Sequence, residues 1–413
     1  MLTYTLIFIN SVIVSAVNLA VSLKTFEVTN SVFYVSLTVL IYNISYILMS
    51  WTWTKTVPNS DAPRKLLFAV FLGYLVSALA IGLSNMVYLI LICSCLIGFS
   101  SAISSPLLIS ILGNQIGKDH LTVSRYNLIS SIASVTGYLI GWLSDNTTLV
   151  LITSSAVSVP AILVVRYLKV VTLIEFKKEL HIPTIPNVTG RVKGTPTIAH
   201  SHTLLYEFRT LFDDLFRTLR KGIVRELQLL LVGTVTLFTA ISTFFTPFPA
   251  YLKSNKLSDG DVFIMNLLSS TTSIVGFRVA SKFVKSVHTS WSVLRLCIGL
   301  RLIIFSIPLL SFSLIQNLYI IKVSLGIFYI LIGFTWAFIS SSLTNLILSL
   351  SEPHKKGERF GHMNGAIGIG SILGSLISTS IGIYGALISY LFVAVFLLIS
   401  LAVLNKAPKT LVT

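Results

Sequence analysis

Charged residues are scarce in this sequence. Only 11% of its 413 residues are Asp, Glu, Lys or Arg, whereas soluble domains carry about 25%. The acids are the rarer sign, with 14 Asp and Glu against 30 Lys and Arg, and none falls in the middle of a hydrophobic run. This composition excludes an ordinary soluble domain. It also leaves no evident carboxylate relay for protons inside the apolar part of the chain.

Cysteine is nearly absent as well. Cys93, Cys95 and Cys297 all lie inside apolar runs, where they resemble small core residues and predict no disulfide framework. The histidines show no spacing typical of a metal site. No glycine-rich loop ending in Gly-Lys-Ser or Gly-Lys-Thr indicates nucleotide binding. We therefore expect no cofactor and no metal, and no clustered pair of catalytic side chains indicates an enzyme.

Long hydrophobic runs are what the sequence has in abundance. Hydrophobic residues make up 54% of the chain, and a helix needs about 20 of them to cross a bilayer. Twelve segments meet this requirement, which predicts an all-α membrane protein with twelve transmembrane helices. The predicted spans are residues 4–22, 31–53, 66–83, 86–112, 122–143, 147–166, 227–250, 261–282, 290–312, 317–349, 360–382 and 384–405.

A long polar stretch separates the spans into six and six. Residues 166–226 contain eleven of the 30 Lys and Arg, and such positive segments stay on the cytoplasmic side of a membrane. Both termini are then cytoplasmic, and the loops on the opposite side contain only Lys24, Lys253 and Lys256. The net charge of +16 thus indicates membrane orientation rather than nucleic-acid binding. We expect a multi-pass protein of the plasma membrane.

The sequence predicts four parts. They are an N-terminal six-helix bundle at residues 1–166, a cytoplasmic linker at 167–226, a C-terminal six-helix bundle at 227–406 and a cytoplasmic tail at 407–413. Within the linker, residues 204–221 carry apolar side chains at helical spacing with a basic face opposite. This pattern predicts an amphipathic helix on the cytoplasmic leaflet, which either tethers the two bundles or regulates them.

Sequence features recur between the two bundles. The segment 28–33 after the first span is similar to 257–263 after the seventh, about 230 residues later. Further on, an arginine precedes a glycine pair in each bundle. The two arginines lie 234 residues apart, and the first glycines of the two pairs lie 233 residues apart. One nearly constant separation indicates two homologous six-helix halves. The residues concerned are Arg125, Gly137 and Gly141, and then Arg359, Gly370 and Gly374.

Three local patterns resemble the major facilitator superfamily, and the similarity in architecture covers nearly the whole chain. They are the small-residue fourth span (98–106), the glycine pattern of the fifth span (137–141) with its counterpart at 365–374, and the proline-containing end of the seventh span (245–251). The family's loop motif G-x-x-x-D-R-x-G-R-R is degenerate here, because TVPNSDAPRK keeps only Arg64 and Lys65. The resemblance implies two pseudo-symmetric six-helix bundles that rock about a central cavity.

The resemblance also implies which residues face that cavity, because the family lines it with the first, fourth, seventh and tenth spans. Hydroxyls and amides on those spans can contact a neutral polar solute, and a tryptophan can stack on it. Each such residue has the plainer interpretation of a hydrogen bond between helices. The candidates are Asn18, Ser101, Ser104, Ser105, Thr239, Thr243, Lys322, Trp336, Ser341 and Asn345.

The resemblance further implies contacts between the halves at glycines and at basic residues near the inner loops. Glycines four residues apart let helix backbones approach closely, either as surfaces that slide during rocking or as static packing. The expected gating residues are Arg64, Lys65, Arg125, Gly137, Gly141, Gly276, Lys282, Arg359, Gly370 and Gly374.

Two cations lie within or near predicted spans. Arg301 falls about ten residues into the ninth span, near the bilayer midplane, where it either snorkels or contacts a neighbouring helix. Lys322 lies near the outer end of the tenth span, where it attracts a polar or anionic solute or snorkels to the interface.

These features predict a monomeric secondary transporter of a small organic solute, with lipid as its other partner and no nucleic acid. We favour export or exchange of a neutral or anionic compound. The alternative is a non-transporting membrane scaffold or receptor that retains the same fold.

Overall fold

The computed structural model describes residues 2–56, 62–116, 119–167, 225–351, 356–381 and 386–406. The predicted amphipathic helix at 204–221, the rest of the linker up to 224 and the tail at 407–413 lie outside these residues. The described helices are α1 (Leu2–Thr29), α2 (Val32–Thr56), α3 (Ala62–Leu83), α4 (Val87–Ile116), α5 (Asp119–Ser144), α6 (Thr147–Arg166), α10 (Arg225–Phe245), α11 (Phe248–Ser254), α12 (Asp259–Phe283), α13 (Val287–Ile304), α14 (Ser306–Leu314), α15 (Leu318–Ser349), α16 (Lys356–Ile381) and α17 (Ala386–Asn405).

The structure confirms an all-α membrane fold. Within its described part, eleven segments are both long and apolar enough to cross a membrane. Helix α5, with 26 residues, runs between its neighbours in the same way and supplies the twelfth crossing. Because the number of crossings is even, the start of α1 and the end of α17 lie on the same side. We call that side the inner end, and the side with the turns at 30–31, 145–146 and 255–258 the outer end.

The seventh and ninth predicted spans are not continuous helices. The seventh is divided into α10 and α11 at Thr246 and Pro247, and the ninth into α13 and α14 at Phe305. A proline has no N–H to offer the carbonyl four residues earlier, and its ring crowds that carbonyl. Pro247 and Pro249 explain the first interruption. Pro308 explains the second, since it cannot bond to the carbonyl of Ile304.

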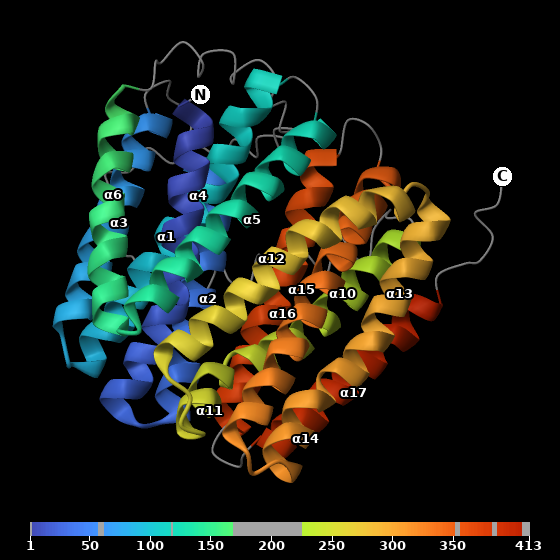
Figure 1. Ribbon diagram of the computed structural model, residues 1–413. Coiled ribbons are helices and arrows are strands. Elements are labelled where there is room, and N and C mark those ends of the chain that lie inside the picture. The colour runs from blue at the N-terminus through green and yellow to red at the C-terminus, as the bar shows by residue number, and fades with distance from the viewer. Residues whose placement is uncertain are drawn as a thin grey trace, which may run out of the picture.

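The helices form two halves that lie side by side in Figure 1. Helices α1 to α6 make the N-terminal half, in which α1 packs against α4, α5 and α6. Helices α10 to α17 make the C-terminal half, in which α10 packs against α16 and α17, and α15 against α12 and α13. The halves meet where α5 crosses α12 and where α2 runs along α16. In the order of the crossings, the fifth thus meets the eighth and the second meets the eleventh.

Most of the predicted glycines pack within a half rather than between the halves. A Cβ on Gly137 would lie 2.7 Å from the Val12 carbonyl oxygen of α1, and one on Gly370 would lie 2.4 Å from the Val235 carbonyl oxygen of α10. The two glycines therefore make the same contact in each half, as the repeat predicts. Their expected position between the halves is wrong.

The second glycine of each pair departs from the symmetry. Gly374 packs against Thr239 of α10 in its own half, so its predicted position between the halves is also wrong. Gly141 does face the other half, because the ring of Phe263 on α12 fills the space beside it. Gly276 packs against Ala337 of α15 within the C-terminal half, which corrects a further expectation.

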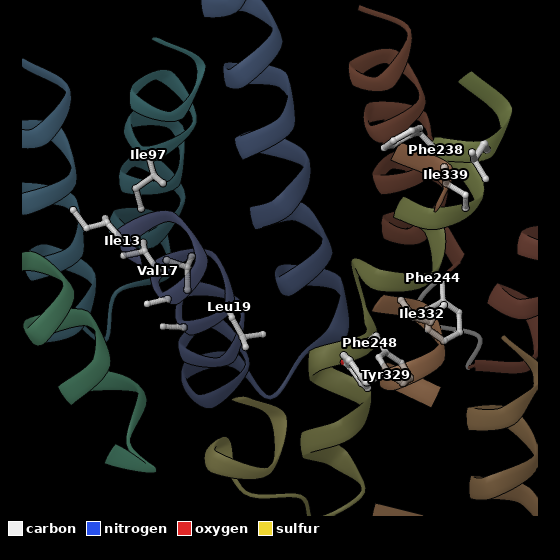
Figure 2. Close-up of a cluster of buried hydrophobic side chains, with 14 of the residues drawn as sticks. Ile13, Val17, Leu19, Ile97, Phe238, Phe244, Phe248, Tyr329, Ile332 and Ile339 are labelled. Atoms are coloured by element: carbon white, nitrogen blue, oxygen red, sulfur yellow. The ribbon is translucent and has the colours of Figure 1, made fainter. Parts of the chain in front are cut away.

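The two halves have different apolar cores, both visible in Figure 2. Ile13, Val17, Leu19 and Ile97 form part of an aliphatic core in the N-terminal half. The C-terminal half is filled by aromatic rings, including Phe238, Phe244, Phe248 and Tyr329. The ring centroids of Phe244 and Phe305 lie 4.5 Å apart, and those of Phe244 and Phe248 lie 4.7 Å apart. These rings pack beside both helix interruptions, where they line a pocket of about 320 Å³ together with Pro247 and Pro308.

The contact of Gly370 with α10 predicts a steric effect of substitution. Gly370→Ala should lower the free energy of unfolding by roughly 1–3 kcal/mol, because the added methyl group overpacks a helix contact. Gly365→Ala is the matched control on the same helix, since its Cβ would meet no atom within 4 Å. Thermal unfolding of both variants in detergent tests this. Equal midpoints for the two variants would contradict the packing described here.

Candidate functional site

The outer end of the α5–α12 contact is held by polar groups from both halves. Asp145, which follows α5, accepts a hydrogen bond from the backbone N–H of Gly260 (2.5 Å), and Thr147 donates to a carboxylate oxygen of Asp259 (2.5 Å). Asp145 has a positive φ of 42°, which turns the chain tightly between α5 and α6. Its carboxylate lies at the N-terminus of α12, where the helix dipole favours negative charge.

Lysines of the C-terminal half neutralise the acids at the start of α12. The Lys253 ammonium lies 2.6 Å from Asp259, and the Lys322 ammonium lies 2.8 Å from Asp261. Lys322 therefore has a carboxylate partner at the outer end. Of the two predicted alternatives for Lys322, attraction of a polar or anionic solute and snorkelling to the interface, this pairing opposes the first.

Uncharged groups hold the other side of the contact, between α2 and α16. Asn43 donates to the Ser375 hydroxyl (2.8 Å), and the hydroxyls of Ser36 and Ser378 lie 3.1 Å apart. Ser375 also lies 3.0 Å from the hydroxyl of Ser242 on α10. These bonds lie in the outer halves of α2 and α16, so the two halves of the protein are joined toward the outer end.

A cavity of about 310 Å³ lies between the halves, on the inner side of these bonds. It is formed by α1, α2 and α4 from one half and by α16 from the other. Its lining combines apolar residues with hydroxyls, amides and two tyrosines, and none of its described lining residues is charged. The lining residues are Val14, Tyr42, Asn43, Tyr46, Ile47, Ser101, Ser105, Asn364, Ile367, Gly368 and Ser371.

The tyrosines of this cavity belong to an ordered polar cluster. The rings of Tyr42 and Tyr46 stack at a centroid distance of 6.2 Å. The Asn18 amide lies 3.5 Å from the Tyr42 hydroxyl. Tyr74, behind the cavity, donates to Ser101 (3.0 Å). These bonds fix the positions of the polar groups before any ligand enters.

The candidates of the N-terminal half are close to this cavity. Ser101 and Ser105 line it, and Asn18 lines a smaller neighbouring pocket of about 150 Å³ that shares Tyr42 and Asn43 with it. Ser104 does not line the cavity. It is fully buried, and its hydroxyl donates to the carbonyl of Ser101. The same hydroxyl lies 3.3 Å from the Tyr74 hydroxyl.

The candidates of the C-terminal half are used mainly for packing. The hydroxyls of Thr239 and Thr243 donate to carbonyls one turn earlier in α10, and Asn345 donates to Ser290 of α13 (2.8 Å). Ser341 is half-buried on α15. Trp336 packs edge-on against Phe238. None of these five residues lines the cavity between the halves.

Among the predicted basic gating residues whose side chains the structure describes, none makes a recorded contact with the other half. Arg64, at the start of α3, donates to the carbonyl of Arg166 in the same half (2.5 Å), and Lys65 beside it is exposed. Arg359 lies 3.5 Å from His362 of its own helix. Lys282 is exposed in the last turn of α12. Arg125 lies on α5, and its side chain is outside the described residues.

Arg301 is buried in the interior of the C-terminal half. It is 1% exposed, and its guanidinium lies 5.8 Å from the ring centroid of Trp336 and 6.0 Å from that of Phe305. Its Nε and Nη1 atoms have no hydrogen-bond partner among the described residues. Of the two predicted alternatives, the structure thus favours contact with a neighbouring helix, through the aromatic faces, over snorkelling.

Several cavity residues were missed by the sequence analysis. Tyr42, Asn43 and Tyr46 come from α2, and Asn364 and Ser371 from α16, which are not among the four spans expected to line a cavity. The sequence did contain a signal for this cavity. It places an amide and two tyrosines within about one and a half helical turns of an otherwise apolar span. Their relevance follows only from the contact between α2 and α16.

The fold and cavity together define a multi-pass membrane protein with a polar pocket between two six-helix halves. The model of the Major Facilitator Superfamily matches residues 3–364. The chain therefore belongs to the Major Facilitator Superfamily, a family of membrane transporters.

Solved structures give the same fold. A mutant form of the nucleoside transporter NupG matches with a TM-score of 0.71 and 13% identity, over 98% of this chain and 98% of that chain. Another crystal structure of NupG matches with a TM-score of 0.66 and 13% identity, over 98% of this chain and 97% of that one. A search of the curated proteins found no matching sequence.

The burial of Arg301 predicts how its replacement changes stability. Replacing a buried, poorly paired charge by an apolar side chain of similar length is neutral or stabilising by roughly 1–4 kcal/mol. Arg301→Met should therefore keep or raise the free energy of unfolding. Phe305→Ala is the comparison in the same cluster and should lower it by roughly 3–5 kcal/mol. A loss for Arg301→Met as large as that for Phe305→Ala, measured by denaturant unfolding, would contradict this interpretation.

Proposed function

We propose that this protein is a carrier that moves a small, neutral, polar organic solute across the membrane by alternating access. The observation that carries the proposal is the cavity between the halves, which lies on the inner side of the hydrogen bonds that join them. A carrier closed at its outer end would hold its solute in this position. A scaffold that only retained the fold would have no need of an ordered polar pocket there.

The lining supports a neutral solute. Its described side chains offer hydroxyls, amides and tyrosine rings, but no charge to balance an ionic group. Tyr42 and Tyr46 present aromatic faces, and Asn364 presents an amide from the opposite half. Aromatic faces with amides suit a flat ring that also forms hydrogen bonds. Since NupG is described as a nucleoside transporter, nucleosides are the first compounds to test.

The sidedness and energetics belong to the same proposal. We propose a monomer in the plasma membrane with cytoplasmic termini, because the basic residues gather in the loops of the inner end. We propose exchange or export as the direction. The uncharged lining of the cavity favours exchange or simple facilitated passage over a proton relay through the cavity.

Transport by purified protein in vesicles tests the function. Vesicles loaded with unlabelled uridine, adenosine, a hexose or a neutral amino acid should take up the labelled form of one of these compounds by counterflow. Asn364→Leu should reduce uptake about 2- to 10-fold, because it removes one hydrogen bond to the solute. Asn405→Leu, the same change on an exposed residue at the end of α17, is the control. No uptake and no thermal stabilisation by any compound would favour the scaffold.

A disulfide between α2 and α16 tests alternating access. The Ser36 and Ser378 hydroxyls lie 3.1 Å apart, so cysteines at both positions can approach bonding distance. In a background without the three native cysteines, oxidised Ser36→Cys/Ser378→Cys should lose more than nine-tenths of its uptake, and reduction should restore it. Each single variant is a control. Full uptake by the fully cross-linked protein would show that the outer contact does not open during transport.

A further inference from the structure

Another pocket lies on the outside of the N-terminal half, between the inner ends of α3 and α6. Its volume is about 540 Å³. Three cationic side chains surround its inner rim: Arg64 and Lys65 from the first turns of α3, and Arg166 from the last turn of α6. Below them it is walled by apolar residues that include Phe68 and Leu163.

Among the residues that the structure describes here, nothing balances the charge of this pocket. No carboxylate is among its described lining residues. Arg166 lies at the C-terminus of α6, where a cation stabilises its own helix. Arg64 and Lys65 lie near the N-terminus of α3, where the helix dipole opposes a cation, and the first turn of α3 contains no acid. Helix stability therefore does not account for these two residues.

The three cations are held together by the fold. Arg64 donates from Nη2 to the main-chain carbonyl of Arg166 at 2.5 Å. This bond joins the start of α3 to the end of α6 and keeps the guanidinium at the rim of the pocket. This hydrogen bond uses Nη2 of the Arg64 guanidinium and holds the guanidinium beside the Arg166 backbone.

The walls of the pocket are exposed to the bilayer. Phe68 is 46% exposed and Leu163 is 53% exposed. They lie about one turn inside the spans that begin at Arg64 and end at Arg166. The cations therefore lie at the level of the headgroups, and the apolar walls lie at the level of the first acyl carbons. A lipid has both of these parts in the same order.

We propose that this pocket binds one anionic phospholipid of the inner leaflet. Its phosphate and anionic headgroup contact Arg64, Lys65 and Arg166, and its acyl chain lies against Phe68 and Leu163. Basic pockets between transmembrane helices on the cytoplasmic side recognise anionic headgroups in this way. The site is separate from the cavity between the halves and does not depend on the proposed solute.

Lipid retention by the full chain tests the proposal. Purified protein would be titrated with phosphatidylglycerol or phosphatidylcholine, and bound copies counted by native mass spectrometry. Arg64→Gln/Lys65→Gln should bind phosphatidylglycerol about 25-fold more weakly, because each cation near an anionic lipid contributes about fivefold. Lys285→Gln/Lys406→Gln removes the same charge from exposed positions at the inner end of the other half, and should change binding less than twofold.

Two further measurements distinguish binding of a lipid from binding of a soluble anion. Leu163→Ser should weaken phosphatidylglycerol binding at least fourfold, because each buried methylene of an acyl chain contributes about fourfold. Glycerol phosphate and inorganic phosphate at the same concentration should not displace the lipid. If either competes equally and Leu163→Ser has no effect, the site is one for a soluble phosphate and the proposal fails.

The proposal also fails if the two double variants bind phosphatidylglycerol equally, or if phosphatidylcholine binds the unaltered chain as tightly as phosphatidylglycerol. Thermal unfolding in phosphatidylcholine would show that each variant is folded. If Arg64→Gln/Lys65→Gln unfolds, Arg166→Gln replaces it, since that variant keeps the backbone carbonyl that Arg64 contacts.

Discussion

Backbone hydrogen bonds must be completed inside the protein wherever the chain crosses the bilayer, because lipid offers no partners. This constraint makes each described crossing helical, and it limits where a helix can be interrupted. The two interruptions, beside Pro247 and before Pro308, both lie in the C-terminal half and outward of Arg301 and Trp336. The rings of Phe244, Phe248 and Phe305 pack together there. Thr246 and Phe305 at the interruptions are only 4% and 0% exposed, so the protein itself shields these turns.

The same constraint shows which features of the fold a sequence can predict. The length of an apolar run shows whether a segment can cross a bilayer, and the charge of the loops shows on which side they lie. The twelve crossings and the six-plus-six grouping could therefore be predicted. The glycine pairs predicted close helix contacts correctly, but not the partner helix. Gly137 and Gly370 face α1 and α10 within their own halves, and periodicity does not say which face of a uniformly apolar helix meets which neighbour.

The cavity was harder to predict than the fold, for a chemical reason. A serine or threonine in a membrane helix can bond to a carbonyl one turn earlier, and Thr239 and Thr243 do so. Such a hydroxyl looks the same in a sequence as one that meets a solute. Tyr42 and Asn364 are cavity residues because α2 and α16 are neighbours across the halves, which is a property of the assembled fold. The two halves also have different interiors. One has an aliphatic core, and the other has aromatic rings that include Trp336 and Phe305 beside the buried Arg301.

The two sides of the outer contact differ in their electrostatics. On one side the carboxylates of Asp145 and Asp259 accept hydrogen bonds across the halves, beside Lys253. On the other side Asn43, Ser36 and their partners are all neutral. Dissolved ions weaken interactions between charges near the surface and leave neutral hydrogen bonds almost untouched. The ionic strength at the outer end therefore acts on the α5–α12 edge, through the ion pairs that hold Asp259 and Asp261 in place, and leaves the α2–α16 edge almost unchanged.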